Sequence, residues 1–283
     1  MVAMGRGSLT GALSGLAKAC HPGPTVAVTA LVTALAVAAG HDTAGSVLVA
    51  AAILTGQLSV GWCNDAVDAP RDTAAARAEK PIVAGQVGVK TVYVSAISAF
   101  AICVPVSFAS GLLAGAVHLV AVAGAWAYNL RLKATLLSWV PYVVGFGSLP
   151  VFVATGLPGR PWPAWWAVVA AAALGLGAHL ANVLPDIGQD IAVGVRGWPQ
   201  RLGPSRVRAL IPLPLLGASA LLVFAPPGPP SAVVWGGLAA VSAFGLAGTA
   251  LGGLSAKIPF AAAIACAAVD VGLLLASGIG VGV

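Results

Sequence analysis

Charged side chains are scarce in this chain: Asp, Glu, Lys and Arg make up 8% of its 283 residues, while 59% are hydrophobic and the mean hydropathy is +0.97. A soluble domain of this size carries about a quarter charged residues. The composition therefore excludes a soluble globular protein. It predicts an all-α, multi-pass integral membrane protein in contact with membrane lipids, with residues 1–283 forming one domain.

Cysteine is also rare, with four residues and no CxxC spacing. This pattern disfavours a zinc site or a disulfide framework and predicts small residues of the core. The net charge of +6 does not indicate nucleic-acid binding, because topology explains the distribution of the basic residues.

Acidic residues number only eight, and five of them fall in two clusters. The first cluster is the stretch 64–72, Asn-Asp-Ala-Val-Asp-Ala-Pro-Arg-Asp, and the second is Asp186 and Asp190. Asn64 precedes Asp68 by four residues, as Asn182 precedes Asp186, and residues four apart stack on one face of a helix. We expect Pro70 and Pro185 to interrupt the helices at these clusters.

Five crowded carboxylates need cations, since two unit charges about 5 Å apart repel by roughly 3 kcal/mol at an effective dielectric of 20. Oxygen ligands without a nearby histidine or cysteine cluster favour a hard cation, and Mg²⁺ is the main candidate. Mg²⁺ usually keeps open positions for water and substrate phosphates, so two facing acidic clusters indicate a metal-bridged diphosphate. The alternative is a pair of solvated loops whose acids keep the surface soluble.

Apolar segments of spanning length follow one another along the chain and predict nine transmembrane helices. They lie at 23–40, 44–64, 90–108, 111–130, 136–156, 163–185, 208–225, 231–250 and 258–280. With a cytoplasmic N-terminus, 13 of the 14 basic residues fall on the inside and only Arg160 falls outside. Residues 1–22 are then an interfacial segment, and 65–89 and 186–207 are cytoplasmic loops that carry the acidic clusters. A cleaved signal peptide at the N-terminus would remove one helix and upset this charge pattern.

At these residues the chain resembles the UbiA superfamily of intramembrane prenyltransferases. The motif N-D-x-x-D-x-x-x-D matches Asn64 to Asp72 at every fixed position, and D-x-x-x-D matches Asp186 and Asp190. Lys80-Pro81, where the family more often has Arg-Pro, and the segment Tyr128 to Lys133 are similar to further family segments. The resemblance covers about residues 20–280.

The resemblance implies nine transmembrane helices around a central cavity, with both motifs at its cytoplasmic mouth. It implies that the motifs bind Mg²⁺ and the diphosphate of an isoprenyl donor. The expected metal ligands are Asn64, Asp68, Asp72, Asp186 and Asp190. The expected catalytic carboxylates are these four aspartates and Asp65, which binds metal through water or assists ionisation. The expected substrate-binding residues are Asn64, Arg77, Lys80, Tyr128, Arg131, Lys133 and Asn182.

The sequence is compatible with more than one role for the basic residues and with more than one reaction. The basic residues either grip the diphosphate or only set the topology. The reaction is prenyl transfer to an aromatic or other lipophilic acceptor, or cyclisation of the donor by a UbiA-type terpene cyclase, and a cation transporter is a third hypothesis. Apart from Arg208 at the very start of the span 208–225, no arginine lies inside a predicted span, where it would mark an acidic aromatic acceptor. The roles of His118, His179 and Asp270, all inside predicted spans, stay unassigned.

Overall fold

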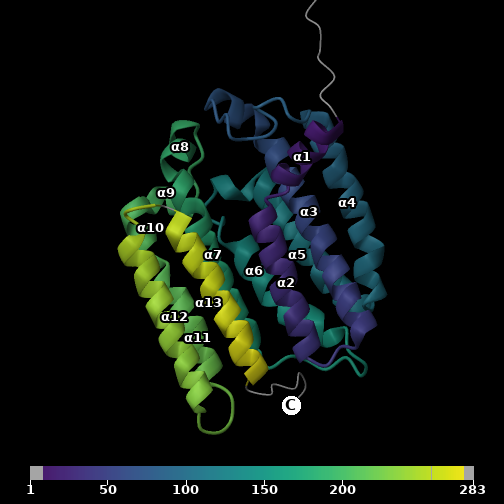
Figure 1. Ribbon diagram of the computed structural model, residues 1–283, viewed down its shortest axis with the longest axis vertical. Coiled ribbons are helices and arrows are strands. Elements are labelled where there is room, and N and C mark those ends of the chain that lie inside the picture. The colour runs from purple at the N-terminus through teal and green to yellow at the C-terminus, as the bar shows by residue number, and fades with distance from the viewer. Residues whose placement is uncertain (1–8, 256, 277–283) are drawn as a thin grey trace, which may run out of the picture.

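The computed structural model describes residues 9–255 and 257–276, and this part of the chain is helical without strands (Figure 1). Arg6 and the last residues of the span predicted at 258–280 lie outside the described residues. The helices are α1 (Leu9–Ala19), α2 (Pro22–Ala38), α3 (Thr43–Ala74), α4 (Val89–Ala109), α5 (Leu112–Leu130), α6 (Val140–Thr155), α7 (Trp165–Val183), α8 (Ile187–Ala192), α9 (Trp198–Leu202), α10 (Pro204–Leu210), α11 (Pro212–Phe224), α12 (Ala232–Leu251) and α13 (Lys257–Ala276). Two 3-10 turns, η1 (Leu132–Ala134) and η2 (Leu184–Asp186), complete the description.

Six helical stretches of the described chain are long and apolar enough to cross a membrane, or seven if the bent pair α1 and α2 counts as one span. Helix α6 is apolar but shorter. The predicted class, an all-α multi-pass membrane protein, is therefore confirmed. The predicted spans coincide with α2 to α7 and α11 to α13. The number of nine membrane crossings stays a prediction.

One predicted boundary is wrong. Helix α3 does not stop at residue 64 or break at Pro70, but continues to Ala74 with Pro70 inside it. Proline removes one backbone hydrogen bond and crowds the preceding turn, which a helix of 32 residues tolerates near its end. At its start, the Asp42 carboxylate caps the helix by accepting a hydrogen bond of 2.7 Å from the Gly45 amide. The first acidic cluster is therefore on a helix and not in a loop.

The helices form a ring around a cavity. Its wall is built by α2, α3, α5, α6, α7 and α13, whereas α4, α11 and α12 contribute no lining residue in the described chain. The ring closes where α13, the last helix, packs against α2 near the start of the chain and against α7. In Figure 1, α1, α8 and α9 lie at one end of the bundle.

Glycines allow the closest helix contacts in this ring. A Cβ atom on Gly175 of α7 would lie 2.4 Å from the Tyr142 carbonyl oxygen of α6. A Cβ atom on Gly61 of α3 would lie 2.4 Å from the Cys20 carbonyl oxygen, at the turn between α1 and α2. Small residues at such positions are typical of helix interfaces in membranes, where close packing replaces the hydrophobic effect as the driving force.

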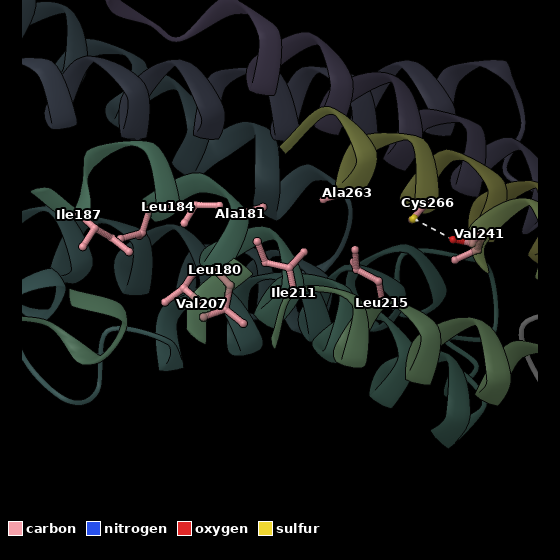
Figure 2. Packing of buried hydrophobic residues seen from close by; sticks show 11 residues of the cluster. Leu180, Ala181, Leu184, Ile187, Val207, Ile211, Leu215, Val241, Ala263 and Cys266 are labelled. Atoms are coloured by element: carbon pink, nitrogen blue, oxygen red, sulfur yellow. Dashed lines mark hydrogen bonds between the residues drawn. The ribbon is translucent and has the colours of Figure 1, made fainter. Parts of the chain in front are cut away.

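The largest apolar cluster holds α7 in place behind the second acidic cluster (Figure 2). Leu180 and Leu184 at the end of α7 pack with Val207, Ile211 and residues of α12 and α13. The four cysteines are buried and free, as expected for core residues. One of them, Cys266, lies in this cluster with its Sγ 3.9 Å from the Val241 carbonyl oxygen. This packing gives the start of the second motif a rigid support.

Candidate active site

A cavity of about 770 Å³ lies inside the ring of helices. Its deeper wall is largely apolar, with residues such as Leu31, Ile53 and Leu149. Its mouth gathers nearly all the polar residues that the sequence marked. Those lining it are Asn64, Asp65, Asp68, Asp72, Arg77, Lys80, Tyr128, Lys133, Asn182, Asp186 and Asp190. The structure therefore brings both acidic clusters to one opening.

The unbroken α3 explains how the first cluster faces the cavity. Asn64, Asp65, Asp68 and Asp72 differ by one, three and four residues, and 3.6 residues per turn places all four on one side of the helix. The expected break at Pro70 would have turned Asp72 away. Instead Asp72 is buried and lines the cavity with Asp68.

Asp68 is held by two cationic side chains. Lys133 Nζ and Arg71 Nη2 both donate to Asp68 Oδ1. On the other oxygen, Asn64 Nδ2 donates to Oδ2 at 3.2 Å, and the same amide nitrogen lies 3.1 Å from Asn129 Oδ1. Asn129 is buried and donates in turn to the Val60 carbonyl oxygen at 3.0 Å. Asn129 therefore orients Asn64.

Asp65 is the most deeply buried carboxylate of the mouth, with 2% of its surface exposed. Lys80 Nζ donates to its Oδ1 at 2.7 Å, and His21 Nε2 donates to the same oxygen at 3.2 Å. Lys80 also lies 4.0 Å from Asp72 Oδ2. The geometry indicates that Asp65 positions Lys80 and His21 at the mouth.

The second acidic cluster begins where α7 ends. Pro185 coincides with the 3-10 turn η2, so here the predicted interruption is confirmed. Asp190 lies on α8, where Gln200 Nε2 of α9 donates to its Oδ2 at 2.7 Å. Gln200 is itself buried, so it holds Asp190 in one orientation.

Arg77 joins the two clusters. Its Nη2 donates to Asp186 Oδ1 at 2.7 Å and its Nη1 to Asp72 Oδ1 at 3.4 Å, while Nε donates to Glu79 at 3.1 Å. Burial alone would lower the pKa of Arg77, but the charges of Asp186 and Asp72 and the hydrogen bond to Glu79 outweigh it and raise the pKa. The guanidinium is therefore a permanent cation between the two carboxylates.

Lys133 enters the site from the turn η1 after α5. It is buried, and burial lowers its pKa while the charge of Asp68 acts in the opposite direction. Lys133 therefore meets Asp68 as a compact point charge on a flexible side chain with three N–H donors.

Aromatic rings line the cavity just inside the mouth. Tyr128 and Tyr142 meet edge to face with centroids 5.3 Å apart, and Phe146 lines the same wall. Asn182 Nδ2 donates to the Tyr142 hydroxyl at 3.0 Å. His179 stands behind both tyrosines, is fully buried and does not line the cavity. Its Nε2 lies 3.2 Å from Ser138 Oγ, which is a structural contact.

Two of the residues singled out in the sequence, Arg131 and Asp270, do not line the cavity. Arg131 is exposed at the end of α5 and is not among the residues that line the cavity, unlike the other residues expected to bind the diphosphate. Asp270 is buried between α11 and α13, where it accepts a hydrogen bond of 2.9 Å from Ser219 Oγ.

Sequence reasoning missed four residues of the site. These are His21, Arg71, Asn129 and Gln200. Only Asn129 carried a usable signal: it is one of three asparagines, and the other two begin the acidic clusters.

The donor set suits a hard divalent cation. All the carboxylate and amide donors are oxygen ligands, and they approach from two sides of one opening. In the described part of the chain, no three His, Cys, Asp or Glu side chains converge as a ready metal site, because basic side chains sit between the acids. In this structure these basic groups balance most of the charge that cations would otherwise neutralise. The fit to Mg²⁺ rests on the donor atoms, which are the oxygen ligands that this ion prefers.

Three solved structures with the same fold are distant from this chain in sequence. A UbiA homologue from Aeropyrum pernix K1, in an apo structure, is 19% identical with a TM-score of 0.70, covering 90% of this chain and 96% of that one. A UbiA homologue from Archaeoglobus fulgidus bound to GPP and Mg²⁺ is 15% identical with a TM-score of 0.68, covering 94% and 99%. A structure of digeranylgeranylglyceryl phosphate synthase is 13% identical with a TM-score of 0.62, covering 95% and 98%. At these identities the likeness shows the fold alone.

The family relationship comes from the sequence itself. No curated protein matches the chain. The family model for the UbiA prenyltransferase family matches residues 26–258, which include both acidic clusters and the wall helices α3, α5, α6 and α7 in full. This match over most of the chain shows that the chain belongs to the UbiA prenyltransferase family.

Proposed function

We propose that this protein is a Mg²⁺-dependent intramembrane prenyltransferase, which ionises an isoprenyl diphosphate and transfers the prenyl group to a lipophilic acceptor. One observation carries the proposal: Arg77 spans two acidic clusters at the mouth of an apolar cavity. A single guanidinium reaches both carboxylates, so one diphosphate with its metal ions fits between them. The apolar cavity below suits a hydrocarbon chain.

The metal ligands in this proposal are Asn64, Asp68, Asp72, Asp186 and Asp190. When bound, Mg²⁺ neutralises negative charge on the departing diphosphate. The chain's own residues supply the rest of the site. Asp65 keeps Lys80 at the mouth, and Gln200 keeps Asp190 oriented.

The basic side chains exchange partners when the donor binds. Arg77, Lys80 and Lys133 each contact a carboxylate in this structure. The phosphate oxygens of the donor offer stronger and more numerous acceptors, and arginine binds them as a two-pronged fork. Arg71, which also contacts Asp68, joins this set.

The chemistry is the cleavage of the bond between C1 of the prenyl chain and the diphosphate oxygen. Both bonding electrons leave with the diphosphate, an electron pair of the acceptor forms the new bond to C1, and the proton that the acceptor then loses passes to the released diphosphate. Tyr128, Tyr142 and Phe146 present π-electron density to the allylic cation on its way. The apolar wall keeps water from capturing the cation.

Relatives and topology support the proposal. Homologues from Archaeoglobus fulgidus have been solved with DMAPP and Mg²⁺ and with GPP and Mg²⁺. The distribution of basic residues supports a mouth on the cytoplasmic side, where a water-soluble diphosphate group would arrive.

The test is diphosphate release by the purified chain in lipid nanodiscs with Mg²⁺ and geranyl, farnesyl or geranylgeranyl diphosphate. We expect release that depends on Mg²⁺ and on an added acceptor extract. No release with any donor would overturn the proposal. The aromatic lining also suits a terpene cyclase, which would release diphosphate and a cyclic hydrocarbon without an acceptor.

A further inference from the structure

Two uncharged polar side chains line the cavity below its mouth, among aliphatic neighbours such as Ile53 and Val122. They are Gln57 on α3 and His118 on α5. Gln57 precedes Asn64 by seven residues, which is about 10 Å along the helix. In the described part of the chain, neither the Gln57 amide nor His118 Nε2 has a hydrogen-bonding partner, although an unsatisfied polar group in an apolar wall costs free energy.

The hydrogen bonds around His118 assign its tautomer. Ser107 Oγ lies 2.6 Å from the Cys103 carbonyl oxygen, which can only accept, so the hydroxyl proton is used there. His118 Nδ1, 2.8 Å from the same Oγ, must therefore be the donor of that bond. The Cys103 thiol does not change this, because it donates to the Ala52 carbonyl oxygen at 3.7 Å. Nε2 consequently carries a lone pair and no proton.

Packing holds the imidazole of His118 in place. Phe152 stacks on the ring with centroids 4.8 Å apart and an interplanar angle of 22°. A Cβ atom on Gly56 would lie 3.3 Å from both Cε1 and Nε2, so this edge of the ring faces α3 at a residue without a side chain. The lone pair is thereby fixed beside the turn of α3 that carries Gln57.

We propose that Gln57 and His118 form the acceptor-binding part of the cavity, and that it takes an uncharged acceptor carrying a hydroxyl group. This inference rests on the proposed function, because it concerns the second substrate of that reaction. A hydroxyl group is a donor and an acceptor at once: it can donate to His118 Nε2 and accept from the Gln57 amide. Each group then gains the partner that it lacks.

A carboxylate does not fit this pair. It has no proton to give to the Nε2 lone pair, and its charge would be buried without a cation. The lysines and arginines that line the cavity belong to helix ends and connections near the mouth. They are Lys18, Arg71, Arg77, Lys80, Lys133 and Lys257. The chemistry therefore favours a neutral alcohol or phenol over an acid.

The experiment measures binding and needs no turnover. The full chain in nanodiscs is loaded with Mg²⁺ and geranyl S-thiolodiphosphate, a donor analogue that resists ionisation, and titrated by calorimetry with three matched probes. The probes are 4-methylbenzyl alcohol, 4-methylbenzoate and 1,4-dimethylbenzene, so that only the first carries a hydroxyl group and only the second carries a charge. We expect the alcohol to bind about tenfold more tightly than the other two, as one satisfied hydrogen-bonding pair implies.

Three variants assign the preference to these residues. Gln57→Leu and His118→Asn should each weaken binding of the alcohol about tenfold, and the shorter amide of His118→Asn can still donate to Ser107. Gln57→Arg should make the carboxylate the tighter ligand. Leu216→Met, a volume-conserving change on α11, which contributes no lining residue in the described chain, should leave all three affinities unchanged.

The outcomes separate this inference from the proposed function. If the donor analogue fails to bind with Mg²⁺, both are wrong. If the analogue binds but the alcohol and the carboxylate bind equally or not at all, only this inference is overturned. The same holds if the order of affinities is identical in the wild type, Gln57→Arg and His118→Asn.

Discussion

Arg77 Nη2 lies 2.7 Å from Asp186 Oδ1, although the two residues are 109 positions apart in the chain. The contact crosses from the connection after α3 to the turn after α7. It places both acidic clusters at the same end of the bundle and within the reach of one side chain. A metal-bound diphosphate needs this proximity, and none of the local sequence patterns could guarantee it.

Loss of either metal-binding aspartate should abolish turnover. We expect Asp68→Ala and Asp186→Ala to lower the rate of diphosphate release by at least about a hundredfold, because each removes a charged ligand from the transition-state site. Expression and thermal stability should change little. Asp42→Ala is the control: it removes the cap of the same α3 at about 1 kcal/mol of stability and should retain activity. Near-normal activity of Asp68→Ala would disprove the metal assignment.

Replacing Arg77 should raise the KM for the donor, whereas replacing Arg131 should not. Arg77→Ala removes the cation between the clusters and should raise the KM for the donor about tenfold or more, with partial recovery in Arg77→Lys, which keeps the charge but loses the fork. Arg131→Ala should behave as wild type, because its side chain is exposed and absent from the cavity lining. Steady-state kinetics over a range of donor concentrations would check both. Equal effects of the two alanine variants would contradict the site described above.

Gln200 should control the affinity for Mg²⁺ through Asp190. Gln200→Met keeps the size of the side chain but removes the hydrogen bond of 2.7 Å, so the Mg²⁺ concentration for half-maximal activity should rise about tenfold. The maximal rate at saturating Mg²⁺ should recover. Gln86→Met, at an exposed glutamine that contacts Lys18 and does not line the cavity, serves as the comparison. An unchanged Mg²⁺ titration in Gln200→Met would show that Asp190 needs no such support.

Helix packing should be sensitive to a single methyl group at Gly175. Gly175→Ala places a Cβ atom 2.4 Å from the Tyr142 carbonyl oxygen, a backbone atom that cannot move alone, and should cost about 1–3 kcal/mol. The melting temperature in detergent should fall by several degrees. Gly217→Ala, in α11 with nothing within 4 Å, should be neutral or slightly stabilising. If both variants melt at the wild-type temperature, the contact between α6 and α7 is looser than described.

The sequence alone determined the class of the protein, the positions of its helices and the residues worth examining at the mouth. These features are local. High hydropathy over about 20 consecutive residues predicts a membrane span, and a spacing of three or four residues predicts that side chains share one face of a helix. Asn64, Asp68 and Asp72 were found in this way because acids are so rare in the chain.

Only the tertiary structure determined how these residues are used. Three features depend on helices that pack together from distant parts of the chain. They are the continuation of α3 through Pro70, the contact of Arg77 with Asp186 and the hydrogen bond from Gln200 to Asp190. The same is true of the lone pair of His118, which is set by hydrogen bonds between α4 and α5. The local sequence determines whether a segment forms a helix and which side chains share a face. Which side chains meet across the cavity depends on the free energy of packing all the helices together.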